Sequence, residues 1–241
     1  MDEQNISNTV INKPENNSQK QIAGAIIIAG VLIAGAVLLK GSTPPSVVNK
    51  GDTFVPTDVK LRPVTKDEHI LGNVNAEVVV VEYSDTECPF CKMFHETMHK
   101  VIKEKGDKVA WVYRHYPIPQ LHQRASKEAE ATECAWEQGG NDTFWKYTDE
   151  IYTRTKSNDS LDPKELPAIA KTLGLNLTSF ETCFSSGKYQ AKVENDVKGG
   201  EEAGVNSTPS SFILKKGKLV DTIRGAQPFS TVITQIEKAL K

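Results

Sequence analysis

Two cysteines separated by two residues, Cys88 and Cys91, are the part of this sequence best suited to chemistry. A cysteine pair at this spacing can be part of a zinc site, a structural disulfide or a redox centre for thiol–disulfide exchange. Pro89 and Phe90 lie between the two cysteines. The pair alone does not decide among the three chemistries, so the segments that position it must do so.

The cysteine pair lies between a predicted strand and a predicted helix. Residues 77–83, EVVVVEY, are nearly all apolar and β-branched, which is typical of a strand buried on both faces. Residues 88–105 carry apolar side chains at helical spacing, and Pro89 suits the first helical position. The free N–H groups and the helix dipole would lower the pKa of the Cys88 thiol. Cys91, one turn further in, is then predicted to resolve a mixed disulfide formed at Cys88.

Zinc is an alternative, because Cys88, Cys91, His95 and His99 follow one another at ligand-like spacing. On one continuous helix, however, the first and last of them are about 16 Å apart along the axis, whereas zinc ligands must all lie about 2.0–2.3 Å from the metal. We therefore expect no metal at the cysteine pair, and no cofactor beyond the redox-active cysteines. His95 and His99 are predicted to be exposed helix residues.

The other segments of the domain predict the order β-α-β, a helical stretch, and β-β-α. A predicted strand at 109–113 completes a short strand–helix–strand unit, which favours a parallel pair of strands. Residues 121–204 show helical segments and no convincing strand. The segments 211–214 and 219–223 flank a glycine-containing turn, as in a hairpin, and 229–240 is an amphipathic helix.

Three stretches carry a resemblance to a known family: residues 72–91, GNVNAEVVVVEYSDTECPFC, the helical stretch, and residues 204–214, GVNSTPSSFIL. Together they are similar to the DsbA-like thiol–disulfide oxidoreductases of the thioredoxin superfamily. The similarity extends over roughly residues 72–241. It implies an α/β, thioredoxin-like fold with an inserted helical domain at about residues 120–203.

The resemblance also implies roles for individual residues. Cys88 resembles the exposed nucleophile of the family, and Cys91 the buried resolving cysteine. Glu82 resembles the acid buried beneath the active site, where a raised pKa would let it exchange a proton with Cys91. In the alternative, Glu82 points outward from a strand edge and has no such role. Thr208-Pro209 resembles the cis-proline loop, which holds an extended substrate.

The dipeptide between the cysteines bears on the redox potential. The strongest oxidants of the family carry Pro-His there, and a histidine can stabilise the thiolate, whereas this chain has Pro89 and Phe90. Phe90 offers an apolar surface to an unfolded substrate instead. The neighbouring Asp85 and Glu87 disfavour a further negative charge. We therefore expect a potential less oxidising than the about −120 mV of the strong oxidant.

Cys134 and Cys183 lie in two different helical segments of the insertion, each beside apolar residues. Three interpretations are open: a structural disulfide, two buried free thiols, or a relay to Cys88 and Cys91. In an oxidising compartment, two buried cysteines of one small subdomain are expected to pair. Such a disulfide would contribute about 4 kcal/mol in the chain-entropy description.

An uncharged apolar segment precedes the domain at residues 22–39. As a helix it is about as long as a bilayer core is thick, which predicts an uncleaved transmembrane anchor. A cleaved signal peptide is the alternative, but the segment exceeds the usual apolar length of about 7–15 residues, and no small-residue cleavage site follows it. Residues 1–21 are predicted to be a polar tail, 40–60 a flexible linker, and 61–241 the DsbA-like domain.

The composition sets limits on partners. The net charge is −2, so no overall field favours nucleic acid as a partner. Disulfide formation requires an oxidising space, which places the predicted domain outside the cytoplasm, in the periplasm or at the cell surface. The expected partners are reduced or unfolded exported proteins, and a membrane redox partner that reoxidises or reduces the cysteine pair.

The leading hypothesis is an anchored oxidoreductase that forms disulfides in exported proteins through Cys88 and Cys91. A reductase or isomerase would use the same cysteines, and its direction depends on a potential and a partner that residues do not reveal. A non-catalytic binding module or a metal carrier on a thioredoxin fold is the third possibility.

Overall fold

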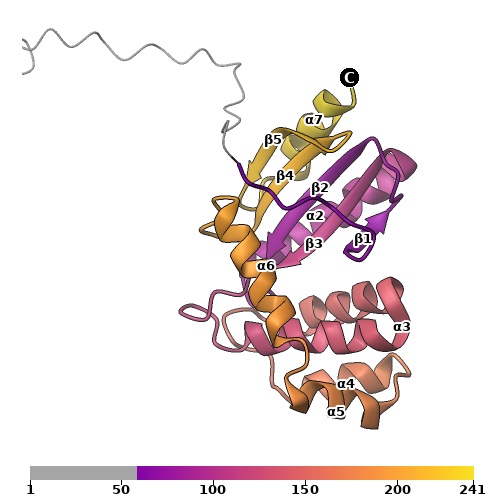
Figure 1. Cartoon of the computed structure of the whole chain (residues 1–241), viewed down its shortest axis with the longest axis vertical. Helices are drawn as coiled ribbons and strands as arrows, with labels where there is room; N and C mark the ends of the chain where they lie inside the picture. The colour runs from indigo at the N-terminus through magenta and orange to yellow at the C-terminus, as the bar shows by residue number, and fades with distance from the viewer. Residues whose placement is uncertain (1–58) are drawn as a thin grey trace, which may run out of the picture. The chain divides into compact units, whose positions relative to one another are not determined.

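The computed structural model describes residues 59–241, in which five strands form one mixed sheet with the order β1-β3-β2-β4-β5 (Figure 1). β2 and β3 run parallel at the centre, as predicted, and the other neighbouring pairs are antiparallel. The strands are β1 (His69–Gly72), β2 (Val78–Ser84), β3 (Val109–His115), β4 (Ser210–Lys215) and β5 (Lys218–Arg224).

The helices follow the predicted order. α2 (Pro89–Lys105) and the short 3-10 helix η1 (Gly106–Lys108) connect β2 to β3. The helical insertion lies between β3 and β4, and α7 (Phe229–Leu240) follows β5. The insertion contains α3 (Ala125–Arg154), α4 (Glu165–Thr172), α5 (Leu177–Ser186) and α6 (Gln190–Glu202).

Helices cover both faces of the sheet. α2 and α7 pack on one face, where Phe94 and Ile236 belong to the same core as Val80. The opposite face packs against α6 and apolar residues of the segment 59–64, which surround the buried ring of Tyr83. Because β2 is central and covered on both sides, it reads as a nearly continuous apolar run.

One detail of the fold differs from the sequence predictions. The edge strand β1 was not predicted: it has only four residues, and Ile70 is a buried apolar member of it. The helical segments predicted for the first part of the insertion are confirmed, as the two halves of α3. They meet at Gly140, whose φ of 66° and ψ of −157° are not helical. A positive φ favours glycine, since it has no Cβ to clash with the backbone.

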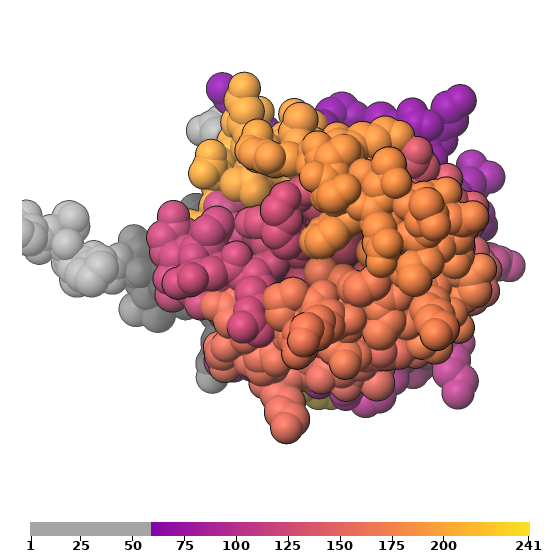
Figure 2. All heavy atoms as spheres, turned by 90° about the horizontal axis from the view of Figure 1, so that it is seen from below, coloured from indigo at the N-terminus to yellow at the C-terminus, as the bar shows by residue number. Residues whose placement is uncertain are grey.

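The insertion has an apolar core of its own, formed by α3, α4 and α5. Tyr147 of α3 is fully buried there and packs against Phe180 of α5. A disulfide joins Cys134 of α3 to Cys183 of α5, with an S–S distance of 2.07 Å. Of the three interpretations of these cysteines, the structure therefore contains the structural disulfide. Figure 2 shows the end of the domain at which the inserted helices gather.

The predicted tail and anchor, and all of the linker before residue 59, lie outside the described residues. In the part that the structure does describe, no helix is both long enough and apolar enough to cross a membrane.

Candidate active site

The cysteine pair lies at the start of α2. Cys88 is the N-cap residue, with an extended backbone, and Pro89 occupies the first turn of the helix as predicted. Both cysteines are free thiols. Cys91 is fully buried, and Cys88 is only 5% exposed, so the nucleophile is more enclosed than the resemblance implies.

The two thiols differ strongly in acidity. A hydrogen bond from the Cys91 side chain lowers the pKa of Cys88 to about 6, and the backbone N–H groups of Cys91 and Phe90 act in the same direction against burial. Burial raises the pKa of Cys91 well above its ordinary value, and the charge at Cys88 raises it further. At neutral pH Cys88 is therefore a thiolate and Cys91 a thiol, which gives the first the properties of a nucleophile.

Glu82 is fully buried on β2, so the alternative in which it points outward is wrong. The indole Nε1 of Trp111 donates to its Oε2 at 2.8 Å, whereas Oε1 has no hydrogen-bond partner among residues 59–241. Burial raises the pKa of Glu82 to about 7, and its charge contributes to the raised pKa of Cys91. A carboxyl group that titrates near neutrality can both give and accept a proton.

The loop before β4 completes the front of the site. The peptide bond between Thr208 and Pro209 is cis. The Cys88 sulfur lies 3.5 Å from the carbonyl oxygen of Thr208, to which it donates when it is protonated. The pairing of β2 with β4, in which Tyr83 lies opposite Ser210, brings this loop to the start of α2.

No pattern in the sequence points to His122, which is a further functional candidate. Its Nδ1 lies 2.9 Å from Oδ2 of Asp85, and the ring is buried. Burial lowers the pKa of His122, but the hydrogen bond with Asp85 and the negative charge at Cys88 outweigh burial and raise it. A protonated His122 therefore favours the Cys88 thiolate, and it supplies a positive charge that the Pro-Phe dipeptide lacks.

Several buried hydroxyl groups lie close together beside Cys91. The Tyr152 hydroxyl lies 3.1 Å from Oγ of Ser84 and 3.2 Å from the hydroxyl of Tyr113, and it also donates to the Asp85 carbonyl. Tyr152 belongs to α3. The insertion thus contributes directly to the surroundings of the resolving cysteine.

The acidic residues near the cysteines are better compensated than the sequence suggests. The buried Glu87 carboxylate accepts hydrogen bonds from the Thr155 hydroxyl and from the backbone N–H groups of Ser160 and Leu161. Burial raises the pKa of Glu128 to about 8, so this neighbouring carboxyl is largely neutral at pH 7. The negative charge next to Cys88 is correspondingly limited.

The prediction that His95 is exposed is wrong. His95 is 4% exposed, because α3 covers this side of α2, and its ring packs against Trp111 with 5.1 Å between centroids. His99, one turn later, keeps 38% of its side chain exposed.

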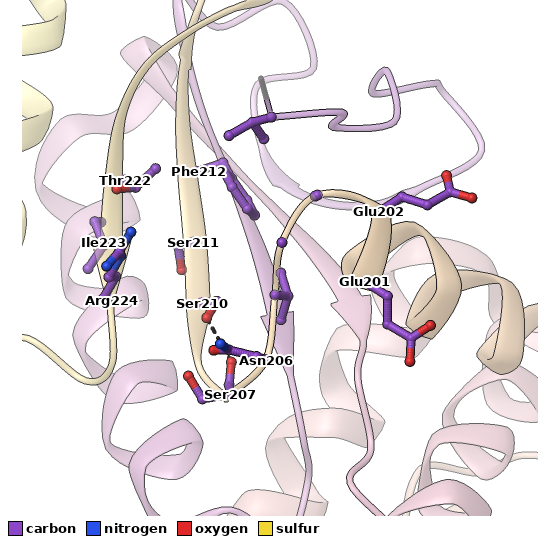
Figure 3. A pocket seen from close by; sticks show the side chains of 14 residues that line it. Glu201, Glu202, Asn206, Ser207, Ser210, Ser211, Phe212, Thr222, Ile223 and Arg224 are labelled. Carbon is purple, nitrogen blue, oxygen red and sulfur yellow. Dashed lines mark hydrogen bonds between the residues drawn. The ribbon is translucent and has the colours of Figure 1, made fainter. Parts of the chain in front are cut away.

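The surroundings of the cysteines include apolar and hollow surfaces. Phe90 and Met93, on the first turns of α2, are 57% and 58% exposed. A cavity of about 380 Å³ borders the cis-proline loop (Figure 3). Ser207, Ser210 and Phe212 line it, and the Ser210 hydroxyl donates to the Ser207 carbonyl.

A nucleophilic thiolate and a second thiol one turn later on the same helix are the reduced form of a cysteine pair suited to thiol–disulfide exchange, in which a thiolate attacks a disulfide sulfur. The fold and this site define the class of DsbA-like thiol–disulfide oxidoreductases. The sequence pattern of the thioredoxin family matches residues 64–235, and the chain belongs to that family.

Solved structures of DsbA-type proteins share the fold. DsbA2 of Pseudomonas aeruginosa is 25% identical, with a TM-score of 0.61 over 73% of this chain and 96% of that protein. Oxidised BdbD of Bacillus subtilis is 23% identical, with a TM-score of 0.64 over 76% of this chain and 98% of that one. The thioredoxin-like fold with a helical insertion is therefore confirmed.

Curated relatives at the sequence level are larger proteins. Na(+)/H(+) antiporter NhaA 1 of Mycolicibacterium gilvum is 32% identical over 159 residues, which is 65% of this chain and 25% of the antiporter. NhaA 1 of Mycolicibacterium vanbaalenii is 33% identical over 156 residues, which is 64% of this chain and 24% of that antiporter. The chain thus spans about a quarter of the length of these relatives.

Proposed function

We propose that this chain is an extracytoplasmic disulfide oxidase that introduces disulfides into exported proteins through Cys88 and Cys91. The stabilised thiolate of Cys88 is the observation that carries the proposal. A pair whose reduced form is stabilised holds its disulfide less tightly and passes it on more readily. The Cys88 pKa of about 6 lies between the pKa values of about 7 in thioredoxin and about 3.5 in DsbA.

The reaction begins from the Cys88–Cys91 disulfide. A substrate thiolate attacks the Cys88 sulfur, and the Cys91 thiolate leaves and takes up a proton, for which the Glu82 carboxyl is placed. A second substrate thiolate then attacks the substrate sulfur of the mixed disulfide and expels the Cys88 thiolate. The substrate is oxidised by two electrons, and the enzyme pair is reduced. The low pKa of Cys88 favours its departure in this last step.

The surface around the pair suits an unfolded polypeptide. Phe90 and Met93 present apolar side chains that can cover the exposed apolar residues of such a substrate. The cavity beside the cis-proline loop offers hydroxyl groups of Ser207 and Ser210 next to Phe212. Mixed apolar and polar contacts of this kind favour a broad range of protein substrates over one fixed sequence.

The compartment is supported by the disulfide between Cys134 and Cys183, because such bonds persist in oxidising spaces and are rare in the cytosol. The predicted anchor at residues 22–39 would keep the domain at the membrane, close to a membrane redox partner. Protease accessibility on intact cells or spheroplasts tests this placement. A domain that stays fully protected would count against it.

Refolding of reduced ribonuclease with the oxidised full-length chain tests the activity. We expect the wild-type chain to restore ribonuclease activity, and Cys88→Ser and Cys91→Ser to abolish this. Lys100→Ala, an exposed change on the same helix, is the matched control. A chain that only reduces insulin or reshuffles scrambled ribonuclease would support the reductase or isomerase alternative. Unchanged activity in both cysteine variants would leave the binding or metal-carrier alternatives.

A further inference from the structure

A second group of potential ligands lies between α2 and α3, apart from the cysteines. His95 and His99 come from α2, and Asp149 comes from α3. Nε2 of His95 lies 2.7 Å from Oδ1 of Asp149, Nε2 of His99 lies 2.9 Å from the same oxygen, and the two nitrogens are 3.1 Å apart. Three ligand atoms from two elements thus converge on one point.

Hydrogen bonds alone do not satisfy this arrangement. Each imidazole Nε2 carries either one proton or one lone pair, so it can serve only one of its two close neighbours well. If both nitrogens donate to Asp149, their hydrogens face each other across the 3.1 Å contact between His95 and His99. If one nitrogen loses its proton, it no longer donates to the carboxylate. A cation between the three atoms would satisfy all of them at once.

The distances also fit a small metal ion. Zinc binds imidazole nitrogen at about 2.0–2.1 Å and carboxylate oxygen at about 2.0–2.2 Å, so tetrahedral ligand atoms lie about 3.3–3.5 Å apart. The three observed separations are shorter than this by less than an ångström. The His99 and Asp149 side chains are 38% and 43% exposed, which gives them room for the outward shift.

We propose that His95, His99 and Asp149 bind one zinc ion, with the fourth ligand position facing solvent. Two histidines four residues apart on one helix face, within His-Glu-Thr-Met-His at 95–99, have the spacing of helical zinc ligands. An open depression of about 870 Å³ adjoins the group, and Glu96 and Thr153 line it as well. It leaves space for water or an external ligand on the ion.

A similar group elsewhere does not support the same inference. His69, His115 and Glu133 also converge, but all three are buried. The ammonium group of Lys192 lies 3.0 Å from Oε1 of Glu133 and already supplies a cation there. In the part of the chain that the structure describes, Asp149 forms ion pairs with the two histidines and with no lysine or arginine.

A bound ion would link α2, which carries Cys88 and Cys91, to α3 of the insertion. The connection continues inward, because His95 packs against Trp111, and the indole of Trp111 donates to Glu82. Nδ1 of His95 has no hydrogen-bond partner within the described residues. Outer-shell partners of metal-binding histidines strengthen affinity by about 10–100-fold, so we expect weaker binding than in closed structural zinc sites.

Zinc titration of the full-length chain with Cys88 and Cys91 oxidised tests the proposal, because the disulfide removes the thiolates as competing ligands. We expect one zinc ion per chain by calorimetry and equilibrium dialysis, and a saturable rise in melting temperature. Cobalt in place of zinc should give visible absorption typical of nitrogen and oxygen ligands, without the charge-transfer band of thiolate.

Substitutions of single residues test which side chains bind the zinc ion. His99→Ala and Asp149→Asn should each weaken zinc binding by more than about 100-fold, beyond the loss of an outer-shell partner. Glu96→Gln, which changes a carboxylate in the same depression, should keep the affinity within a few-fold. His99 is partly exposed, so its variant should fold even if Asp149→Asn does not. No binding by the oxidised wild-type chain, or equal binding by His99→Ala, would overturn the proposal.

Discussion

The Cys88 sulfur lies 3.5 Å from the carbonyl oxygen of Thr208, although 120 positions separate the two residues in the sequence. The direct pairing of β2 with β4 brings them together at one end of the sheet. A polypeptide that pairs with the Thr208 loop would therefore present its own sulfur to Cys88. The nucleophile and the loop that faces it thus lie side by side at one end of the sheet.

The thiolate of Cys88 should be observable by titration. In the reduced chain, ultraviolet thiolate absorbance and the rate of alkylation should rise with a midpoint at a pH of about 6. Cys91→Ala should move the midpoint to higher pH, because it removes the hydrogen bond that contributes most to the lowered pKa. Lys100→Ala is the control.

The same shift affects stability. Because folding lowers the pKa of Cys88 from about 8.5, the stabilisation of the reduced chain is full above pH 8.5 and is lost as the pH falls through about 6. A wild-type midpoint near 8.5, or no shift in Cys91→Ala, would contradict the proposed thiolate.

The dipeptide should tune the redox potential. We expect the wild-type pair to lie between about −270 mV, the value of thioredoxin, and about −120 mV, the value of DsbA. Phe90→His should move the potential toward the oxidising end, because an imidazole beside Cys88 stabilises the thiolate. Equilibration with glutathione buffers measures this, with Phe90→Ala as the control for lost aromatic surface. A wild-type value near −120 mV would contradict the expectation.

Glu82→Gln should separate proton transfer from stability. Folding raises the pKa of Glu82, so its contribution to stability is present below about pH 4.3 and is lost as the pH rises through about 7. Glutamine stays neutral and still accepts from Trp111. Relative to wild type, the variant should therefore gain on the order of 3 kcal/mol of unfolding free energy between pH 4 and pH 8.

Glu82→Gln should slow the reaction, although it raises the free energy of unfolding. Without an exchangeable proton beside Cys91, the step in which the Cys91 thiolate leaves and the mixed disulfide forms should slow, and its rate should lose the pH dependence centred near 7. Stopped-flow fluorescence and urea unfolding across pH measure the two effects. Glu77→Gln, at an exposed position just before β2, should show neither. Parallel pH profiles for wild type and Glu82→Gln would argue against the role.

His122→Gln tests whether a charge remote in sequence acts on the nucleophile. Glutamine can keep a hydrogen bond to Asp85 but carries no positive charge. The pKa of Cys88 should therefore rise, and the potential should become more reducing. Gln123→Ala, in the same loop, is the control. An unchanged Cys88 pKa with an intact fold would limit His122 to a structural role.

Removal of the structural disulfide should weaken the fold and leave the chemistry intact. The double variant Cys134→Ala/Cys183→Ala opens a loop of 49 positions, which costs about 4 kcal/mol of unfolding free energy in the chain-entropy description. Urea unfolding measures the loss. Below the unfolding transition, ribonuclease refolding should proceed as in wild type. Loss of that activity would instead support the interpretation in which Cys134 and Cys183 form a redox relay to Cys88 and Cys91.

Local patterns predicted the elements that position the cysteines. β2 and the start of α2 follow from an apolar run and from Pro89 behind Cys88, which are properties of neighbouring residues. β1 was not predicted, because four residues with Ile70 and Leu71 as their apolar members give too little periodicity. It is recognisable only by its pairing with β3.

Contacts between elements that are far apart in the sequence could not be predicted from local sequence patterns. The burial of His95 depends on α3 lying over α2, and neither helix alone encodes that packing. His122 and Tyr152 reach the active site from the insertion side for the same reason. The position of Asp149 beside His99 likewise required the folded chain.

The disulfide between α3 and α5 also affects how the protein matures. Before the bond between Cys134 and Cys183 exists, each newly made chain must give up two electrons and two protons to an oxidant. Every copy thus consumes one pair of oxidising equivalents before its insertion is complete. When oxidant is scarce, fewer copies form the disulfide between Cys134 and Cys183, so the yield of mature protein should depend on the redox state of its surroundings.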